Sequence, residues 1–218
     1  MLSITEENYL KAILYLSLDG DEDLGVGTNE LAQSLDVKPS SVNDMLKKLR
    51  QKGFIEYEKY GKIFMSDQGK VFAIQILRKH RLWETFLYEK LDFTWDEVHE
   101  VAEQLEHIKS DKLIEKLDKF LGFPKNDPHG DPIPNAAGEF DFVPKKILAD
   151  IEAGGHCKMV SVKDNSVAFL NYVVEIGLGI NNDIKVLSKQ AFDLSLEIEI
   201  NEKRIRVSQK FAQNIYVV

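Results

Sequence analysis

The stretch from Trp95 to Asp111, WDEVHEVAEQLEHIKSD, organises the rest of the chain. Its periodicity predicts one helix. Because each helical residue advances by about 100°, four potential metal ligands fall within about 100° of arc: His99, Glu103, Glu106 and His107. Apolar residues take the opposite side of that helix: Val98, Val101, Ala102, Leu105 and Ile108. One face is therefore suited to packing, and the other is suited to holding a divalent cation.

A second pair of potential ligands precedes this stretch. In His80-Arg-Leu-Trp-Glu84 the histidine and the glutamate are four residues apart, on one face of a helix expected over residues 68–90. Imidazole nitrogen and carboxylate oxygen without a thiolate favour Mn(II), then Fe(II), with Zn(II), Co(II) or Ni(II) as ions that bind in vitro. The alternative is that both groups are solvated polar helix surface.

Composition sets the class of protein. The chain has 218 residues, of which 44% are hydrophobic and 29% charged, as in a soluble protein of two or three small domains. No apolar run reaches the length of a transmembrane helix, so no membrane partner is expected. The N-terminal residues lack the basic and apolar regions of a signal peptide, and a single cysteine, Cys157, excludes an intrachain disulfide. A cytoplasmic location follows as the expectation.

The first third of the chain predicts a DNA-binding module. We expect a helix capped by Thr5, a short helix capped by Thr28, a third helix that starts at Pro39 or Ser40 and stops at Gly53, and a hairpin over residues 54–65. Helix, turn, longer helix and hairpin are the order of a winged helix-turn-helix, whose second helix enters the major groove. The alternative is a helical hairpin without a DNA role.

Charge is distributed unevenly. The net charge of −8 argues weakly against nucleic acid, but residues 37–62 are locally basic. Ten residues of this module, all but Pro39 polar or basic, are expected to contact DNA: Thr28, Lys38, Pro39, Ser40, Ser41, Asn43, Lys47, Lys48, Lys59 and Lys62. The expected partner is a double-stranded DNA operator.

The remaining segments predict a helical part and a β part. Apolar helices over residues 68–90, 95–110 and 111–121 suit pairing with a second copy in a homodimer. Residues 123–142 are rich in Pro and Gly and predict an extended linker, in which His129 is interpreted as loop filler. A short helix is expected within residues 140–153 and a second one over Val167–Ile176. Short strands over residues 157–162, 184–189, 194–200, 204–207 and 215–218 then predict a small barrel.

Enzymatic motifs are incomplete. His99-Glu100-Val-Ala-Glu103 approaches the zinc-protease motif HExxH, but its fifth position is Glu. A di-iron bundle needs Glu-x-x-His pairs on two helices, whereas Glu103 and His107 are four residues apart. No catalytic triad, phosphate loop or dinucleotide fingerprint is found, so the chain is not expected to be an enzyme.

Several motifs together resemble the diphtheria-toxin-repressor family of metal-dependent regulators, including its manganese-transport-regulator branch. The resemblance covers nearly the whole chain and is carried by Thr5 to Leu10, Lys38 to Val42, Arg78 to Leu82 with Glu84, His99 to His107 and Asp127 to Pro134. It implies one metal site at Asn8, Glu103, Glu106 and His107, and a neighbouring site at His80, Glu84 and His99. It also implies an SH3-like (FeoA-like) third domain, and the glutamate at position 103 resembles the manganese branch.

These observations predict a mainly α protein with a β C-terminal part. We expect a winged helix-turn-helix domain at residues 1–70, a helical metal-binding and dimerisation domain at 71–124, a linker at 125–150 and an SH3-like small β-barrel at 151–218. The predicted function is a Mn(II)- or Fe(II)-activated DNA-binding repressor of metal-uptake genes. Two alternatives stay open: a winged-helix regulator that senses a small organic ligand, with a structural His/Glu cluster, and a metal-storing or structural adaptor.

Overall fold

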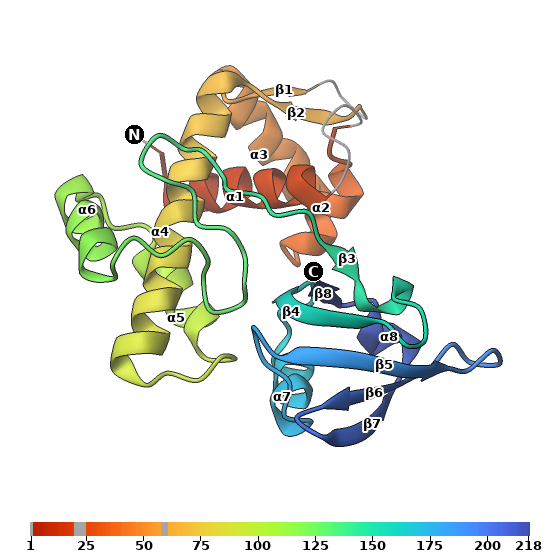
Figure 1. Cartoon of the computed structure of the whole chain (residues 1–218). Coiled ribbons are helices and arrows are strands. Elements are labelled where there is room, and N and C mark those ends of the chain that lie inside the picture. Colours follow the sequence, from red (N-terminus) through yellow and green to blue (C-terminus); the bar gives the residue numbers. More distant parts are fainter. Residues whose placement is uncertain (1, 20–24, 58–60) are drawn as a thin grey trace. The chain divides into compact units, whose positions relative to one another are not determined.

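The computed structural model describes residues 2–19, 25–57 and 61–218 (Figure 1). The chain divides into two compact units. The first unit holds Met1–His80, Glu103–Asp111 and Pro134–Glu139, and the second holds Arg81–Ala102, Lys112–Ile133 and Phe140–Val218. Among the described residues, no helix combines the length and the apolar composition that crossing a membrane requires.

Helix α1 (Ile4–Asp19) opens the first unit with a capping box. The backbone N–H of Glu6 donates to Ser3 Oγ (3.3 Å), and the backbone N–H of Ser3 donates to Glu6 Oε2 (2.9 Å). This reciprocal pair satisfies two of the amide groups that the start of a helix leaves without partners. The prediction of Thr5 as the N-cap is therefore wrong, because Thr5 already lies inside the first turn.

The helix-turn-helix is formed by α2 (Thr28–Ser34) and α3 (Pro39–Gln51), as predicted. Gly27 is the N-cap of α2, and its N–H donates to Glu30 Oε2 (3.2 Å). The prediction of Thr28 as the cap is therefore wrong by one position. Helix α3 starts at a proline, whose missing N–H costs nothing in the first turn, and buries three residues in the core: Val42, Leu46 and Leu49.

The end of α3 follows the prediction closely. Gly53 adopts φ +77°, its N–H donates to the carbonyl of Arg50, and the N–H of Phe54 donates to the carbonyl of Leu49, both at 3.0 Å. This pattern is the Schellman motif, which favours glycine because the left-handed conformation is strained for other residues. The chain is thereby turned directly into the first strand of the hairpin.

The hairpin pairs β1 (Ile55–Tyr57) with β2 (Ile63–Met65) in antiparallel register, with Glu56 opposite Phe64. An isolated bridge between Val26 and Ile63 adds a third segment beside β2. Residues 58–60, including the expected DNA contact Lys59, lie outside the described residues. The elements expected of a winged helix-turn-helix are thus present in the first unit (Figure 1).

Helix α4 (Asp67–Leu91) runs through both units, followed by α5 (Val98–Leu105) and α6 (Asp111–Phe120). The single helix predicted from Trp95 to Ser110 is therefore wrong at both ends. Before α5, the N–H of Thr94 donates to Glu97 Oε2 (2.9 Å), which forms a turn that delays the helix start. After Leu105 the chain leaves the helix, so Glu106 and His107 lie in the following turn.

The second unit contains an antiparallel six-stranded sheet in the order β3-β8-β4-β5-β6-β7. Its elements are β3 (Lys146–Ile147), the 3₁₀ turn η2 (Leu148–Asp150), β4 (His156–Val162), α7 (Val167–Glu175), β5 (Asp183–Lys189), β6 (Leu196–Ile200), β7 (Lys203–Val207), α8 (Gln209–Ala212) and β8 (Ile215–Val217). The predicted small β-domain and its helix are confirmed, while the helix expected within residues 140–153 is only the 3₁₀ turn. Alternating residues of the strands build a core that also includes Trp95.

The capping residue Glu6 predicts a pH-dependent contribution to stability. Its other oxygen accepts a hydrogen bond from Lys52 Nζ (2.6 Å), and this bond together with the bond from Ser3 lowers the pKa of Glu6. Stability from a carboxylate with a lowered pKa is present above the unfolded-state pKa and lost as the pH falls through the folded-state pKa. We expect Glu6→Gln to reduce the free energy of unfolding by about 1 kcal/mol near neutral pH and by much less near pH 3.

Urea denaturation followed by circular dichroism at both pH values measures this difference. Glu30→Gln, which alters the exposed capping-box carboxylate of α2, is the matched control and should have a smaller effect. An equal loss of stability at both pH values for Glu6→Gln would contradict the assignment.

Candidate metal centre

Helices α1, α4 and α5 and the turn after α5 bring polar side chains together in the first unit. We call them the first cluster: Glu7 and Lys11 from α1, His80 from α4, Glu103 from the end of α5, and Glu106 and His107 from the turn after it. Charged groups that are distant in sequence thus share one partly buried site. Such convergence needs a physical reason, because burying several ionisable groups is costly.

Glu106 lies at the centre of the first cluster and is 0% exposed. Its Oε2 accepts a hydrogen bond from Lys11 Nζ (2.7 Å) and lies 2.6 Å from His80 Nδ1. Its Oε1 has no hydrogen-bond partner among the described residues. A fully buried carboxylate oxygen without a donor is unfavourable, which indicates that this oxygen is available to a cation.

His107 faces that oxygen with its other ring nitrogen. His107 Nδ1 lies 2.6 Å from Glu7 Oε2, and since an ionised carboxylate only accepts, Nδ1 carries the proton. His107 Nε2 lies 3.7 Å from Glu106 Oε1. Two ligands that each bind a metal at about 2.1 Å can be up to about 4 Å apart, so this pair fits one divalent cation. Glu7 then orients the imidazole, as outer carboxylates do in metal sites.

Asn8 follows Glu7 on α1. Its amide oxygen Oδ1 is buried. Asn8 lies on the same helix as Glu7 and Lys11, and its Oδ1 accepts no hydrogen bond from the described residues. A ligand role for Asn8 therefore stays a prediction.

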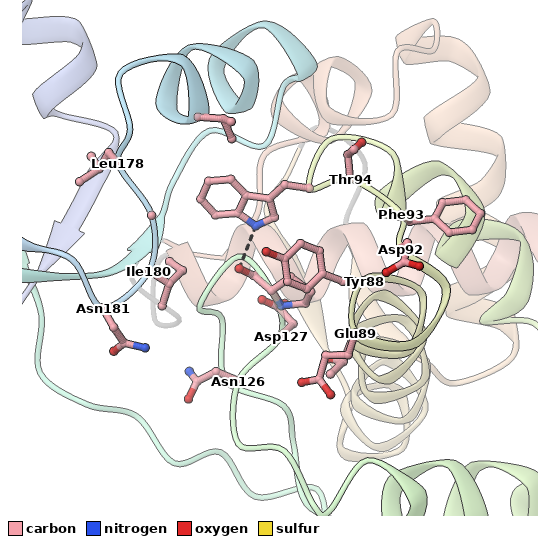
Figure 2. Close-up of a pocket in the computed structure, with 15 residues that line it drawn as sticks. Tyr88, Glu89, Asp92, Phe93, Thr94, Asn126, Asp127, Leu178, Ile180 and Asn181 are labelled. Carbon is pink, nitrogen blue, oxygen red and sulfur yellow. Dashed lines mark hydrogen bonds between the residues drawn. The ribbon is translucent and has the colours of Figure 1, made fainter. Parts of the chain in front are cut away.

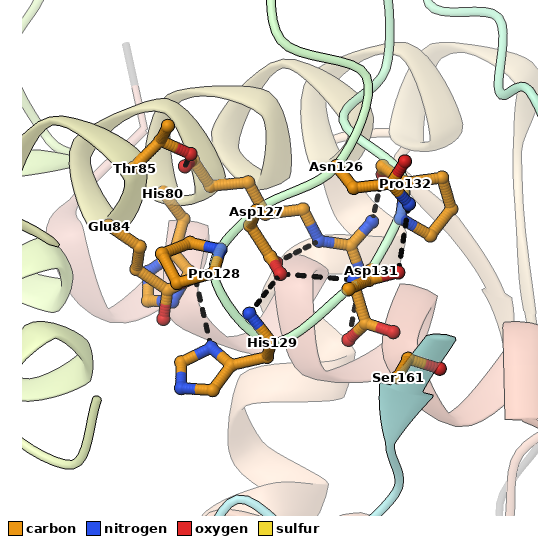
Figure 3. A network of polar contacts seen from close by, with 12 residues as sticks. His80, Glu84, Thr85, Asn126, Asp127, Pro128, His129, Asp131, Pro132 and Ser161 are labelled. Atoms are coloured by element: carbon orange, nitrogen blue, oxygen red, sulfur yellow. Dashed lines mark hydrogen bonds and ion pairs between the residues drawn. The ribbon is translucent and has the colours of Figure 1, made fainter. Parts of the chain in front are cut away.

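The second unit contains another group of potential ligands (Figure 3). Oxygens of Glu84 and Asp127 and a ring nitrogen of His129 all lie within 4.8 Å of one another, and all three side chains are buried. We call these residues the second cluster. His99 Nδ1 lies 3.2 Å from Glu84 Oε1, so the predicted pair Glu84 and His99 is in contact, although the side chain of His99 is 46% exposed.

The electrostatics of the second cluster favour a positive charge. Burial raises the pKa of Asp127 to about 7, and the charges of Asp131 and Glu84 add to that effect. Burial opposes the charged form of His129, but its hydrogen bond with Glu84 and the charges of Glu84 and Asp127 raise the pKa of the ring to about 9. His129 Nε2 lies 3.0 Å from the carbonyl of Trp95, so Nε2 donates and Nδ1 is directed to Glu84. Oxygen and imidazole donors of this kind fit Mn(II) or Fe(II).

A loop with several internal polar contacts carries Asp127 and His129 (Figure 3). Asp127 Oδ1 accepts hydrogen bonds from the backbone N–H groups of His129 (2.9 Å) and Asp131 (3.0 Å). Arg81 Nε lies 3.4 Å from Asp127 Oδ2, and Arg81 also donates to the carbonyl of Pro132. Gly130 adopts φ +87°, and a Cβ there would lie 1.8 Å from the carbonyl oxygen of Val160. Only glycine permits this close approach of the loop to β4.

Four residues of the two clusters were not predicted from the sequence as part of a metal site: Glu7, Lys11, Asp127 and His129. His129 is 1% exposed and is not loop filler, because its ring stacks on Trp95 with centroids 5.6 Å apart. The available signal was the compact run Asp127-Pro128-His129-Gly130-Asp131-Pro132, in which prolines and glycine fix a turn between acids and a histidine.

A pocket of about 780 Å³ adjoins the second cluster in the second unit (Figure 2). Its lining includes the aromatic rings of Tyr88 and Trp95 and the carboxylates of Glu89, Asp92 and Asp127. The indole N–H of Trp95 donates to the carbonyl of Pro128 (2.8 Å) and closes one wall. Asp127 of the second cluster therefore lines a pocket whose walls include acidic and aromatic side chains.

The expected DNA-contacting residues lie on the helix-turn-helix and the hairpin of the first unit. Thr28, Pro39, Asn43 and Lys62 line a hollow of about 630 Å³. Exposed residues of the same module are Lys38, Ser40, Ser41, Lys47 and Lys48. Some of these side chains have partners among the described residues. Lys47 pairs with Asp44 (3.0 Å), Asn43 Nδ2 donates to the carbonyl of Pro39 (2.9 Å), and Lys62 Nζ donates to the carbonyl of Gly25 (3.4 Å).

Comparison with known families covers most of the chain. Residues 1–63 match the model of the iron dependent repressor N-terminal DNA binding domain, and residues 66–135 match the iron dependent repressor metal binding and dimerisation domain. Residues 147–218 match the FeoA domain, so the C-terminal β-domain is SH3-like, as predicted.

Individual relatives agree with these matches. An uncharacterised HTH-type transcriptional regulator of Methanocaldococcus jannaschii is 38% identical over 120 residues, which are 55% of this chain and 94% of that protein. The iron-dependent repressor IdeR of Mycobacterium bovis is 31% identical over 130 residues, and this match spans 60% of the chain but only 55% of the length of IdeR.

Solved structures extend the likeness to the full chain. A manganese-dependent transcriptional repressor in complex with manganese is 33% identical, with a TM-score of 0.89 over 98% of this chain and 99% of that one. These relatives do not favour the alternative of a regulator that senses a small organic ligand. The chain belongs to the diphtheria-toxin-repressor family of metal-dependent transcriptional repressors, as its motifs imply.

Proposed function

We propose that this chain is a repressor of metal-uptake genes that binds its operator when Mn(II), or secondarily Fe(II), fills the first cluster. The observation that carries the proposal is the buried meeting of α1, α4 and the turn after α5 at Glu106. Helix α1 belongs to the module that contacts DNA, whereas the other two elements belong to the segment matched by the metal-binding domain. A cation shared between them would connect sensing to DNA binding.

We propose Glu103, Glu106 and His107 of the first cluster, together with Asn8 of α1, as the ligands of one metal site. We propose His80, Glu84 and His99 as ligands of a neighbouring site, and Asp127 and His129 of the second cluster as further ligands because of their burial and distances. The bound ion would compensate the negative charge of these buried carboxylates. The manganese complex among the similar structures and the iron-dependent IdeR support Mn(II) and Fe(II) as the ions, and Zn(II), Co(II) or Ni(II) would bind in vitro.

The chain's own residues would convert binding into a DNA response. Glu7 holds the ring of His107, so the position of α1 depends on the turn that carries Glu106. A protein that has a loose and a fixed arrangement of α1 shifts to the fixed one when a ligand binds that arrangement better. In a homodimer, this would set two recognition helices about 34 Å apart, one turn of DNA.

The other parts of the chain have corresponding proposed roles. Residues 1–70 contact DNA, and residues 71–124 bind metal and form the homodimer. Residues 125–150 connect to the SH3-like domain at 151–218 and supply Asp127 and His129. No catalytic role is proposed, and a regulator of this kind acts in the cytoplasm, where its operator is found.

Glu106 and His107 are the residues on which the proposed metal response depends most directly. We expect Glu106→Gln and His107→Ala each to weaken Mn(II) binding by about tenfold or more, because each removes a ligand of a buried site. The Mn(II)-dependent increase in operator affinity should be lost with them. His156→Ala changes an exposed histidine of β4 and is the control.

Calorimetric titration with Mn(II) and fluorescence anisotropy with operator DNA, at a stated salt concentration, measure both effects. A normal Mn(II) response in Glu106→Gln and in His107→Ala would contradict the proposed function.

His129 is the proposed imidazole ligand of the second cluster. His129→Ala should bind one Mn(II) ion fewer per chain than the wild type, since the buried ring is replaced by a methyl group that cannot ligate. The stoichiometry is measured by metal analysis after gel filtration. His129 precedes Gly130, where the loop packs tightly against β4, so His129→Ala could also change stability. Thermal unfolding of the variant measures that effect. An unchanged number of bound ions in a folded variant would exclude His129 as a ligand.

Lys48 is one of the residues proposed to contact DNA. Lys48 is exposed on α3, and Lys48→Ala should weaken operator binding and reduce the slope of log affinity against log salt by about one if Lys48 contacts a phosphate. Lys203→Ala removes the same charge from β7, outside the DNA-binding module, and should leave the slope unchanged. Equal slopes for Lys48→Ala and the wild type would remove Lys48 from the interface.

A further inference from the structure

A lysine lies inside the first cluster. Lys11 is only 5% exposed, and its ammonium group donates to Glu106 Oε2 at 2.7 Å and to Glu103 Oε1. Both carboxylates are proposed metal ligands. The side chain therefore does not snorkel to solvent, which is the usual behaviour of lysine on a helix. Its position is determined by the two acids.

The charges of the cluster explain why the lysine is there. Three carboxylates, on Glu7, Glu103 and Glu106, converge on this site, and a buried carboxylate is stable only when a positive charge or hydrogen-bond donors compensate it. The Lys11 ammonium lies against two of these carboxylates and provides a charge of that sign. Lys11 thereby compensates part of the negative charge of the cluster from within the chain.

The two oxygens of Glu106 have different surroundings. Oε2 is occupied by Lys11 and His80, whereas Oε1 lacks a hydrogen bond and lies 3.7 Å from His107 Nε2. A divalent ion held by Oε1 and Nε2 would share the Glu106 carboxylate with the Lys11 ammonium. In a partly buried site, like charges that share one carboxylate repel strongly.

We infer that Lys11 is an internal competitor of the metal and sets the affinity of the first cluster. Its ammonium and a divalent ion require the same carboxylates of Glu103 and Glu106, so binding of the ion must weaken or displace the lysine. The flexible four-carbon stem of lysine allows this movement. The inference rests on the proposed metal site, and it gives α1 a tether through Lys11 when no metal is bound.

The simpler alternative is that Lys11 only stabilises the fold by an ion pair. The two interpretations differ in the effect of removing the charge. A purely structural lysine predicts lower stability and unchanged or weaker metal binding, whereas a competitor predicts lower stability of the metal-free protein together with tighter metal binding.

The test is calorimetric titration of the full chain with Mn(II) after removal of bound metal, in parallel with thermal unfolding with and without Mn(II). Lys11→Met keeps the apolar stem and removes the charge. We expect its dissociation constant for Mn(II) to fall by roughly tenfold or more. Its midpoint of unfolding should fall without metal and rise more on Mn(II) addition than that of the wild type.

Lys52→Met is the matched control. Lys52 also pairs with a glutamate of α1, since its Nζ lies 2.6 Å from Glu6 Oε1, but this pair is not part of the first cluster. We expect Lys52→Met to lower stability and to leave the dissociation constant for Mn(II) unchanged. An equal increase of affinity in both variants would overturn the inference, because it would show a general effect of charge.

The outcome also separates this inference from the proposed function. If neither the wild type nor Lys11→Met binds Mn(II), both fail. If the wild type binds Mn(II) and Lys11→Met binds it no more tightly, only the inference about Lys11 fails. Should Lys11→Met not fold with or without Mn(II), Lys11→Gln, which retains hydrogen-bond donors for Glu103 and Glu106, gives the same measurement.

Discussion

The buried carboxylate of Glu106 is the constraint on which the first unit depends. A carboxylate with no solvent contact must be compensated, and here the compensation comes from a lysine of α1 and a histidine of α4. Both partners lie far from Glu106 in the sequence. The requirement to compensate one charge therefore fixes the position of helix α1 against the elements that carry the proposed metal ligands.

The same physical problem is solved differently in the second unit. There the acids Asp127 and Glu84 are buried beside His129. A short loop with two prolines and a glycine carries Asp127 and His129, whereas Glu84 lies on α4. The guanidinium of Arg81 and backbone N–H groups supply most of the loop's polar contacts. One cluster is thus assembled from separate helices, while the other is built largely by one preorganised loop and a single helix.

Helix boundaries show where local sequence ceases to be sufficient. The end of α3 was predictable, because Gly53 provides a conformation that few other residues adopt. The end of α5 carries no such local signal, and the apolar spacing of Val98, Ala102 and Leu105 continues to Ile108. The chain nevertheless leaves the helix at Leu105, and this change delivers Glu106 to a buried position among Lys11 and His80 instead of a helix face.

Local patterns in the chain predict the class of the protein, the order of its elements, the residue types proposed as metal ligands and the basic helix-turn-helix module. Those features depend on periodicity, on capping chemistry and on residue type, which act over a few neighbouring positions. The three-dimensional arrangement of the chain is needed to place Lys11 and Glu7 beside Glu106 and His107, and to bury Asp127 and His129 together. The reason is that burial and charge compensation depend on which distant side chains meet, and no local pattern encodes that meeting.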